Sequence, residues 1–178
     1  LGFLVAIIMD MFEFFYKSIY PILIITQTIP TVAIAPLLVL WLGYGILPKI
    51  VLIVLTSFFP ITIGLLDGFK SADKDALKLM KTMGATPFQN FVHIKLPSSI
   101  GYFFAGLRIS VSYSIIGAVV AEWLGGFDGL GVYMTRVRKS YSFDKMFAVI
   151  FLISIISLFL MFVVKKIQKL SMPWEEAI

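Results

Sequence analysis

Long apolar stretches without charged residues constrain this chain more than any other feature. Residues 19–48, 50–66 and 146–164 contain no Asp, Glu, Lys or Arg, and residues 99–121 contain one charge, Arg108. A helix of about 20 mostly apolar residues crosses a bilayer. Charged residues make up 14% of the chain, whereas soluble domains contain about 25%. The sequence therefore predicts an all-α, polytopic membrane protein.

The apolar segments predict one membrane domain over residues 1–178. Residues 1–9 are too short to cross a bilayer, and we interpret them as the partial tail of an N-terminally truncated helix. A short polar turn with Asp10, Glu13 and Lys17 is expected next. The complete spans are expected at approximately residues 20–41, 46–67, 98–121 and 145–165. Prolines interrupt the first of these, which predicts a kinked or partly unwound helix.

Basic residues beside the spans predict the orientation of the protein. The loop 70–96 is rich in lysine, and so is the segment 165–169 after the last span. Two spans separate these segments, so both lie on one side of the membrane, which the positive-inside rule assigns to the cytoplasm. The net charge of +5 has the same explanation and gives no reason to expect a nucleic-acid partner. Residues 122–145 are then expected outside.

The loop itself is predicted to contain two short helices. Good helix formers extend over residues 72–83, and Gly84 suits the left-handed position after a helix end. Thr86 then begins a T-x-x-Q capping box with Gln89, which predicts a second helix through residues 88–93. Pro97 is expected to hold the preceding residue out of helix and to open the next span.

The first helix of this loop has an apolar stripe opposite its lysines, formed by Leu79, Met80 and Met83. Such a stripe suits two environments equally. It can lie on the lipid surface with the lysines near phosphates, or it can fill a groove on a partner protein, where methionine adapts well. The physical pattern alone leaves both alternatives open.

An ordered set of motifs makes the chain similar to one transporter family. Gly84, nine residues and then I-x-L-P at 94–97 match half of the so-called EAA loop of ABC importer permeases. The further matches are Q-T-I-P at 27–30, A-P-L at 35–37, W-L-G-Y-G at 41–45, G-L-R at 106–108, A-E-W at 121–123 and G-L-G at 129–131. The chain resembles the nitrate/sulfonate/taurine-type permeases, and its E-W-L-G-G and G-L-G-V-Y-M segments most resemble permeases for thiamine pyrimidine precursors.

The resemblance implies a type I importer bundle in a bacterial inner membrane and several partners. A cytoplasmic ATPase, an extracytoplasmic solute-binding protein and a second, identical permease copy are expected. The sequence has no GxxxxGK[ST] phosphate loop, so ATP is expected to be used by the partner and no cofactor by this chain. The implied substrate is a small organic molecule such as a thiamine pyrimidine precursor, or a sulfonate, nitrate or riboflavin-like solute.

The resemblance also assigns a contact with the ATPase to the central loop. The residues concerned are Asp75, Lys78, Leu79, Met80, Met83, Gly84, Ala85 and Thr86. The family's Glu-Ala-Ala occurs here as Lys78-Leu79-Met80, so a base replaces the acid. Asp75 lies one turn earlier as a possible substitute. We therefore expect docking to depend on the apolar stripe more than on an acidic contact.

Other polar residues are candidates for the pathway and for the outer surface. An intramembrane charge such as Arg108 should face protein or a water-filled path, and it is interpreted either as a pathway charge or as a structural partner of Asp67 or a helix end. Mid-span Ser112 and Tyr113 are further pathway candidates. The candidates for contact with the binding protein are Trp41, Glu122 and Trp123. One His and no Cys predict no metal site.

Two other functional classes compete with the permease hypothesis. A self-contained channel or ion-coupled carrier is supported by the proline-broken segment at 19–48, but it calls for more intramembrane charges than Arg108. An intramembrane enzyme is disfavoured because no cluster of His, Asp, Glu or an activated Ser is found at membrane depth.

Overall fold

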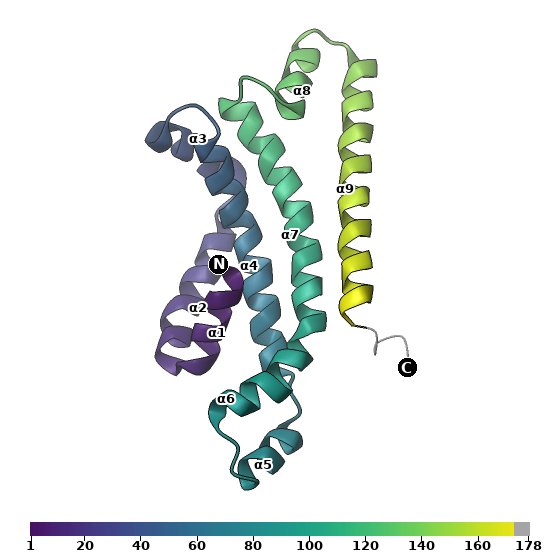
Figure 1. Cartoon of the computed structure of the whole chain (residues 1–178). Coiled ribbons are helices and arrows are strands. Elements are labelled where there is room, and N and C mark those ends of the chain that lie inside the picture. Colours follow the sequence, from purple (N-terminus) through teal and green to yellow (C-terminus); the bar gives the residue numbers. More distant parts are fainter. Residues whose placement is uncertain (173–178) are drawn as a thin grey trace.

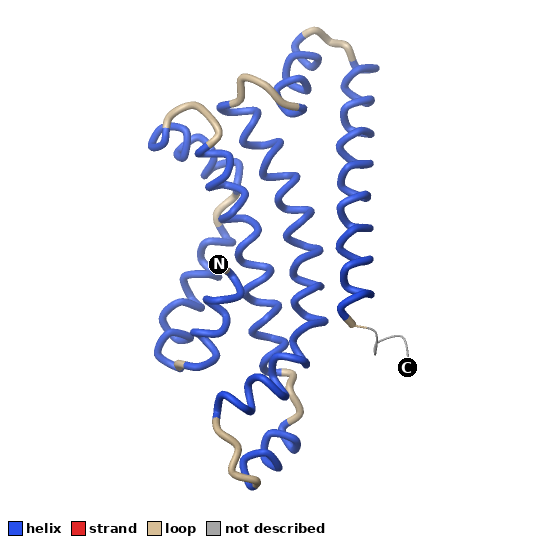
Figure 2. Tube along the Cα trace, in the orientation of Figure 1, coloured by secondary structure: helices blue, strands red, loops and turns tan. Residues whose placement is uncertain are grey.

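The computed structural model describes residues 1–172 as a helical protein without strands (Figures 1 and 2). The all-α membrane bundle predicted from the sequence is thereby confirmed. The remaining residues of the expected domain, 173–178, lie outside the described part. The elements are α1 (Gly2–Met11), α2 (Glu13–Thr28), α3 (Thr31–Leu42), α4 (Leu47–Lys70), α5 (Lys74–Thr82), α6 (Pro87–Asn90), the π-helix η1 (Phe91–Lys95), α7 (Leu96–Gly125), α8 (Leu130–Lys139) and α9 (Phe143–Ser171).

Three helical stretches of the described chain are long and apolar enough to cross a membrane. These are α4, the 38-residue stretch Pro87–Leu124 that ends in α7, and α9. The spans expected at 46–67, 98–121 and 145–165 fall on them. The chain passes down α4, up α7 and down α9, so that α5 and α6 lie at one end and α8 at the other (Figure 1).

Small residues bring α4 and α7 close together at the centre of the bundle. A Cβ on Gly106 of α7 would lie 2.4 Å from the carbonyl oxygen of Pro60, and one on Gly64 of α4 would lie 2.8 Å from that of Tyr102. The Ser110 hydroxyl donates across the interface to the carbonyl of Ser57 at 2.6 Å. Small residues and interhelical hydrogen bonds are typical of helix pairs in membranes, where the hydrophobic effect does not drive association.

The expected span at 20–41 contains a break, as its prolines predicted, and falls on two helices. Helices α2 and α3 meet at an angle of 100°, and only Ile29 and Pro30 lie between them. Proline disfavours helical geometry in the residue before it, and Ile29 is extended, with φ −82° and ψ 120°. The expected polar turn is also shorter than predicted, because Phe12 alone separates α1 from α2, and Glu13 and Lys17 are helical.

Pro97 lies at the start of α7 as expected, but the prediction that it holds Leu96 out of helix is wrong. Leu96 is helical, with φ −64° and ψ −49°, and its N–H bonds to the carbonyl of Phe91 across the wide turn of η1. The turn shifts hydrogen bonding by one residue just before Pro97, which has no N–H to donate. Helix α6 therefore continues through η1 into α7 (Figure 1).

Candidate functional site

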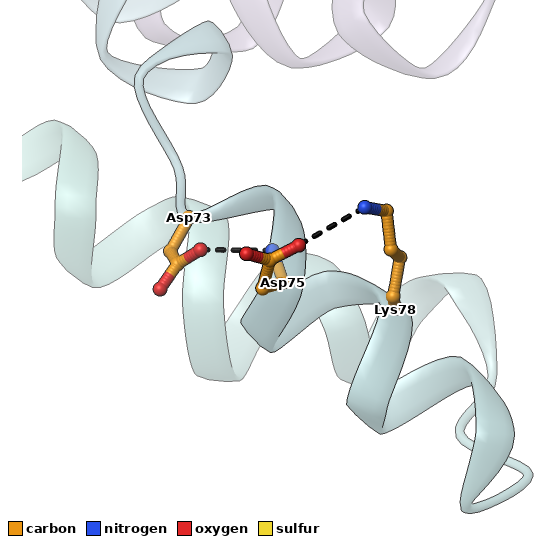
Figure 3. A network of polar contacts seen from close by, with 3 residues as sticks. All are labelled: Asp73, Asp75 and Lys78. Atoms are coloured by element: carbon orange, nitrogen blue, oxygen red, sulfur yellow. Dashed lines mark hydrogen bonds and ion pairs between the residues drawn. The ribbon is translucent and has the colours of Figure 1, made fainter.

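The hairpin formed by α5 and α6 projects from one end of the bundle (Figure 1). Asp73 caps the start of α5, and its side chain accepts a hydrogen bond from the N–H of Asp75 at 2.8 Å (Figure 3). The helix ends in a Schellman motif, in which Gly84 has a φ of +81° and the Ala85 N–H bonds to the carbonyl of Met80 at 3.0 Å. The turn expected at Gly84 is therefore present.

The capping box expected at the second helix is also confirmed. The Thr86 hydroxyl accepts from the N–H of Gln89 at 3.3 Å, and the Gln89 side chain accepts from the N–H of Thr86 at 2.8 Å. Both bonds satisfy amide donors at the start of α6 that have no partner within the helix. With both ends capped, the connection between α5 and α6 has a defined geometry.

The hairpin exposes apolar side chains from both of its helices. Leu79 and Met83 of α5 are 62% and 74% exposed, and Phe88 of α6 is 68% exposed. Met80 is half-buried. Phe88 was not among the predicted contact residues, although its position directly after the Thr86–Pro87 helix start was the available signal. The exposed apolar surface of the hairpin, here defined as Leu79, Met83 and Phe88, thus extends over both helices.

Lys78 forms an ion pair within α5. Its Nζ lies 3.0 Å from Oδ1 of Asp75, and the two side chains are 76% and 87% exposed (Figure 3). Asp75, the expected substitute for the glutamate that the resemblance implies, is thus paired with Lys78, the base at the position of that glutamate. Exposed pairs of this kind contribute little, about 0.3–0.5 kcal/mol for neighbours on a helix.

Two lysines attach the base of the hairpin to the N-terminal helices. Lys95 of η1 donates to both carboxylate oxygens of Asp10 in α1, at 2.7 and 2.9 Å. Lys70, the last residue of α4, donates to the Tyr16 hydroxyl of α2 at 2.6 Å, and its Nζ lies 4.3 Å from the centroid of that ring. Each end of the hairpin is therefore joined to one of the first two helices.

Two cavities lie beside the break between α2 and α3. The first has a volume of about 300 Å³ and is lined by the α2–α3 junction, α4 and α7. The second, of about 370 Å³, is lined by α4 and α7 and reaches Asp67 and Tyr102. Gln27 and Tyr113 line both cavities. Tyr113 was a pathway candidate, whereas Gln27 and Tyr102 were not, since nothing in the local pattern places them at a cavity.

The other two pathway candidates do not line these cavities. Arg108 is half-buried, and its guanidinium donates to the side-chain oxygen of Gln168 on α9. Of its two expected structural partners, Asp67 is thus not the one bonded, and Arg108 instead contacts a glutamine in the last turn of α9. The Ser112 hydroxyl donates to the carbonyl of Arg108 one turn earlier, at 3.5 Å.

The three candidates for the outer surface belong to α3 and α7. Trp41 and Trp123 are exposed, in the last turns of the two helices. Glu122 instead accepts a hydrogen bond from the N–H of Gly131 at 2.7 Å. Its carboxylate thereby caps the first turn of α8, where negative charge is favourable. Gly129, with a φ of +133°, leaves the space that this carboxylate fills.

Comparison with known proteins identifies the family. The family model described as "Binding-protein-dependent transport system inner membrane component" matches residues 1–173. The formylaminopyrimidine transport permease protein ThiX of Halalkalibacterium halodurans is 40% identical over 176 residues, which cover 99% of this chain and 70% of the relative.

Further similarities point to the same class of protein. A probable ABC transporter permease protein of Haemophilus influenzae is 43% identical over 166 residues, covering 91% of this chain and 68% of the relative. The taurine transport system permease protein TauC of Escherichia coli is 30% identical over 154 residues, covering 86% of this chain and 56% of the relative. The chain therefore belongs to the binding-protein-dependent permeases and is a multi-pass inner membrane component of an ABC importer.

Proposed function

We propose that this permease forms part of a solute pathway and is driven by a separate cytoplasmic ATPase through the α5–α6 hairpin. One observation carries the proposal: the hairpin exposes Leu79, Met83 and Phe88 outside the bundle, on a connection capped at both helices. Apolar side chains on short helices are suited to filling a groove on a partner. ATP hydrolysis then belongs to the partner chain.

The attachments at the base of the hairpin provide a route for movement. A displacement of the hairpin would pull on Asp10 through Lys95 and on Tyr16 through Lys70. Tyr16 belongs to α2, the helix that ends at the break beside the cavities. We infer that motion of the hairpin reaches the cavities through α2.

The proposed solute is an uncharged aminopyrimidine. The support is the name of the Halalkalibacterium relative, together with cavity linings in which Asp67 is the one charged residue from the described part of the chain. A sulfonate or a riboflavin-like solute is the alternative, because relatives with lower identity carry those names. Two identical copies are proposed to enclose the pathway, with the binding protein docking near Trp41 and Trp123.

The test is to reconstitute the permease with its ATPase and binding protein and to measure ATP-driven uptake. Leu79→Ser and Met83→Ser are each expected to weaken co-purification of the ATPase and to reduce uptake about tenfold or more. Phe143→Ser is the matched control, because this side chain is 60% exposed outside the hairpin. Normal uptake by both hairpin variants would disprove docking through this surface.

A further inference from the structure

Gln27 and Tyr113 stand out because the same two side chains line both cavities. Gln27 lies in the last turn of α2, next to the break, and Tyr113 lies in α7. Both side chains are exposed at the cavity surface. Within residues 1–172, neither the Gln27 amide nor the Tyr113 hydroxyl forms a hydrogen bond. An amide and a phenol that border both cavities are thus available to a solute.

Two other hydroxyls of the first cavity act only as acceptors. The Thr26 hydroxyl donates to the carbonyl of Leu23 at 2.7 Å, and the Thr56 hydroxyl donates to its own helix at 3.0–3.1 Å. With their protons engaged, these hydroxyls offer only lone pairs to a solute. The Thr31 hydroxyl is a donor in the first cavity alone, whereas the donors Gln27 and Tyr113 line both cavities.

The charges around the cavities disfavour anions. Within residues 1–172, no Lys or Arg lines either cavity, and the one charged lining residue is Asp67, in the second. Arg108, on α7, is bonded to Gln168 of α9. A sulfonate moving from water into this lining would lose hydration without gaining a positive partner, which is costly. An uncharged solute avoids this loss of hydration free energy.

The shapes of the available groups favour a flat heterocycle. The Gln27 amide presents a donor and an acceptor side by side, which matches a ring nitrogen next to an amino group. The Tyr113 ring offers an aromatic face to a planar solute, and apolar Ile34 and Pro30 line the same cavity. Most of a small ligand's contact area is apolar in such sites, and a few polar groups set its orientation.

We propose that Gln27 and Tyr113 determine the solute specificity of the pathway and form its selecting point, which accepts uncharged planar nitrogen heterocycles and rejects sulfonates. The Gln27 amide forms hydrogen bonds with a ring nitrogen and its neighbouring amino group, and Tyr113 contacts the face of the ring. Asp67 repels anions from the second cavity. This inference rests on the proposed transport function, since it names the group of residues that selects the transported solute.

The experiment measures weak solute binding to the permease–ATPase complex in nanodiscs by saturation-transfer NMR, without the binding protein. The probes are an aminopyrimidine and methanesulfonate at neutral pH. Wild-type complex is expected to bind the aminopyrimidine and not the sulfonate. Gln27→Leu is expected to weaken aminopyrimidine binding about tenfold, which corresponds to about 1.4 kcal/mol. Tyr113→Phe is expected to weaken it severalfold, and Gln27→Asn to retain part of it.

Matched controls separate selection from folding. Thr28→Val removes a hydroxyl next to Gln27 in the last turn of α2, and Thr28 does not line either cavity. Tyr133→Phe removes a phenol hydroxyl on α8, from a side chain that is 42% exposed, as Tyr113 is. Both are expected to bind the aminopyrimidine as the wild type does. Gln27→Arg introduces a cation and is expected to bind methanesulfonate in place of the aminopyrimidine.

The outcomes distinguish this inference from the proposed function. Equal binding by wild type and Gln27→Leu would overturn the selecting point, whereas ATP-driven uptake of the aminopyrimidine would still uphold the function. Preference of wild type for methanesulfonate would overturn the solute class. Loss of uptake in the Leu79 and Met83 variants bears on docking alone, because binding in nanodiscs does not depend on hydrolysis.

Discussion

At the level of single residues, the charge on α5 differs from what the resemblance to importer permeases implies. The resemblance implies a glutamate at the position of Lys78, and Lys78 pairs with Asp75 in the same helix. Because both side chains are highly exposed, the pair contributes little to stability. The hairpin therefore exposes the apolar side chains of Leu79 and Met83, and its Asp75 carboxylate is not unpaired.

Exchange of this charge is therefore predicted to have a small effect. Lys78→Glu removes the pair with Asp75 and places two acids one turn apart, which destabilises α5 by about 0.2–0.5 kcal/mol. ATPase affinity, measured by titration against the permease in nanodiscs, is expected to change less than about threefold. Lys81→Glu on the same helix is the control for net charge. A large gain in coupled uptake by Lys78→Glu alone would show that the acidic contact matters.

The sequence was sufficient to predict the site residues whose hydrogen-bond partners lie within a few residues of them in the chain. Gly84 and the Thr86–Gln89 capping box were predictable because turn and cap geometry depends on four or five consecutive residues. The contacts of Lys95 and Lys70 were not, since their partners lie 85 and 54 residues away. The shared position of Gln27 and Tyr113 was missed for the same reason.

The contact between α4 and α7 determines the centre of the bundle at the level of helices. Gly106→Ala would place a methyl group 2.4 Å from the backbone carbonyl of Pro60, and backbone cannot move away cheaply. We expect the thermal unfolding temperature in detergent to fall by several degrees, with a free-energy loss of about 1–3 kcal/mol.

Gly101→Ala is the control for this substitution. Its added methyl would lie 3.5 Å from the Met172 side chain, an ordinary contact, and alanine favours helix over glycine by about 1 kcal/mol. The unfolding temperature of this variant is expected to stay the same or rise. An equal loss in both variants would contradict the role of close backbone approach.

The prolines of the segment 19–48 show that a helix-breaking residue in the sequence does not determine how far the helix bends. Pro21, Pro30 and Pro36 all predicted distortion, but only Pro30 lies at a break. Helices in membranes tolerate proline where neighbouring groups satisfy the freed backbone, so each proline alone predicts a kink and not its size. The 100° bend depends on where α2 and α3 pack, and that information is not local.

The ion pair between α1 and η1 gives a second prediction for the helices. The Asp10 and Lys95 side chains are only 14% and 27% exposed, so removing one charge leaves the other poorly solvated. Asp10→Asn is expected to lower the free energy of unfolding by about 1–3 kcal/mol and to reduce uptake at unchanged ATPase binding.

Glu13→Gln provides the contrast for Asp10→Asn. Its pair with Lys17 lies on α2 and is 73–79% exposed, so its loss is expected to leave unfolding and uptake unchanged. If Asp10→Asn behaved like Glu13→Gln in both measurements, the proposed route of movement through α1 would be wrong.

At the level of the whole molecule, the candidate surfaces for the ATPase and for the solute-binding protein lie at opposite ends. The α5–α6 hairpin lies at one end and α8 at the other, and α7 leads from the hairpin to α8 (Figure 1). The cavities lie between, at the break that follows α2. This separation fits a device in which ATP acts on one side and solute enters from the other.

The separation predicts the sidedness of the whole chain, and the sequence makes the test simple. These 178 residues contain no cysteine, so each introduced cysteine reports on its own position. Lys81 in α5 and Tyr141 between α8 and α9 are both exposed, and α7 separates them. In intact cells, a membrane-impermeant maleimide is expected to label Tyr141→Cys and to label Lys81→Cys only after permeabilisation. Met83→Cys should follow Lys81→Cys. The reverse pattern would contradict the orientation that basic residues predict, and it would leave the hairpin out of reach of a cytoplasmic ATPase.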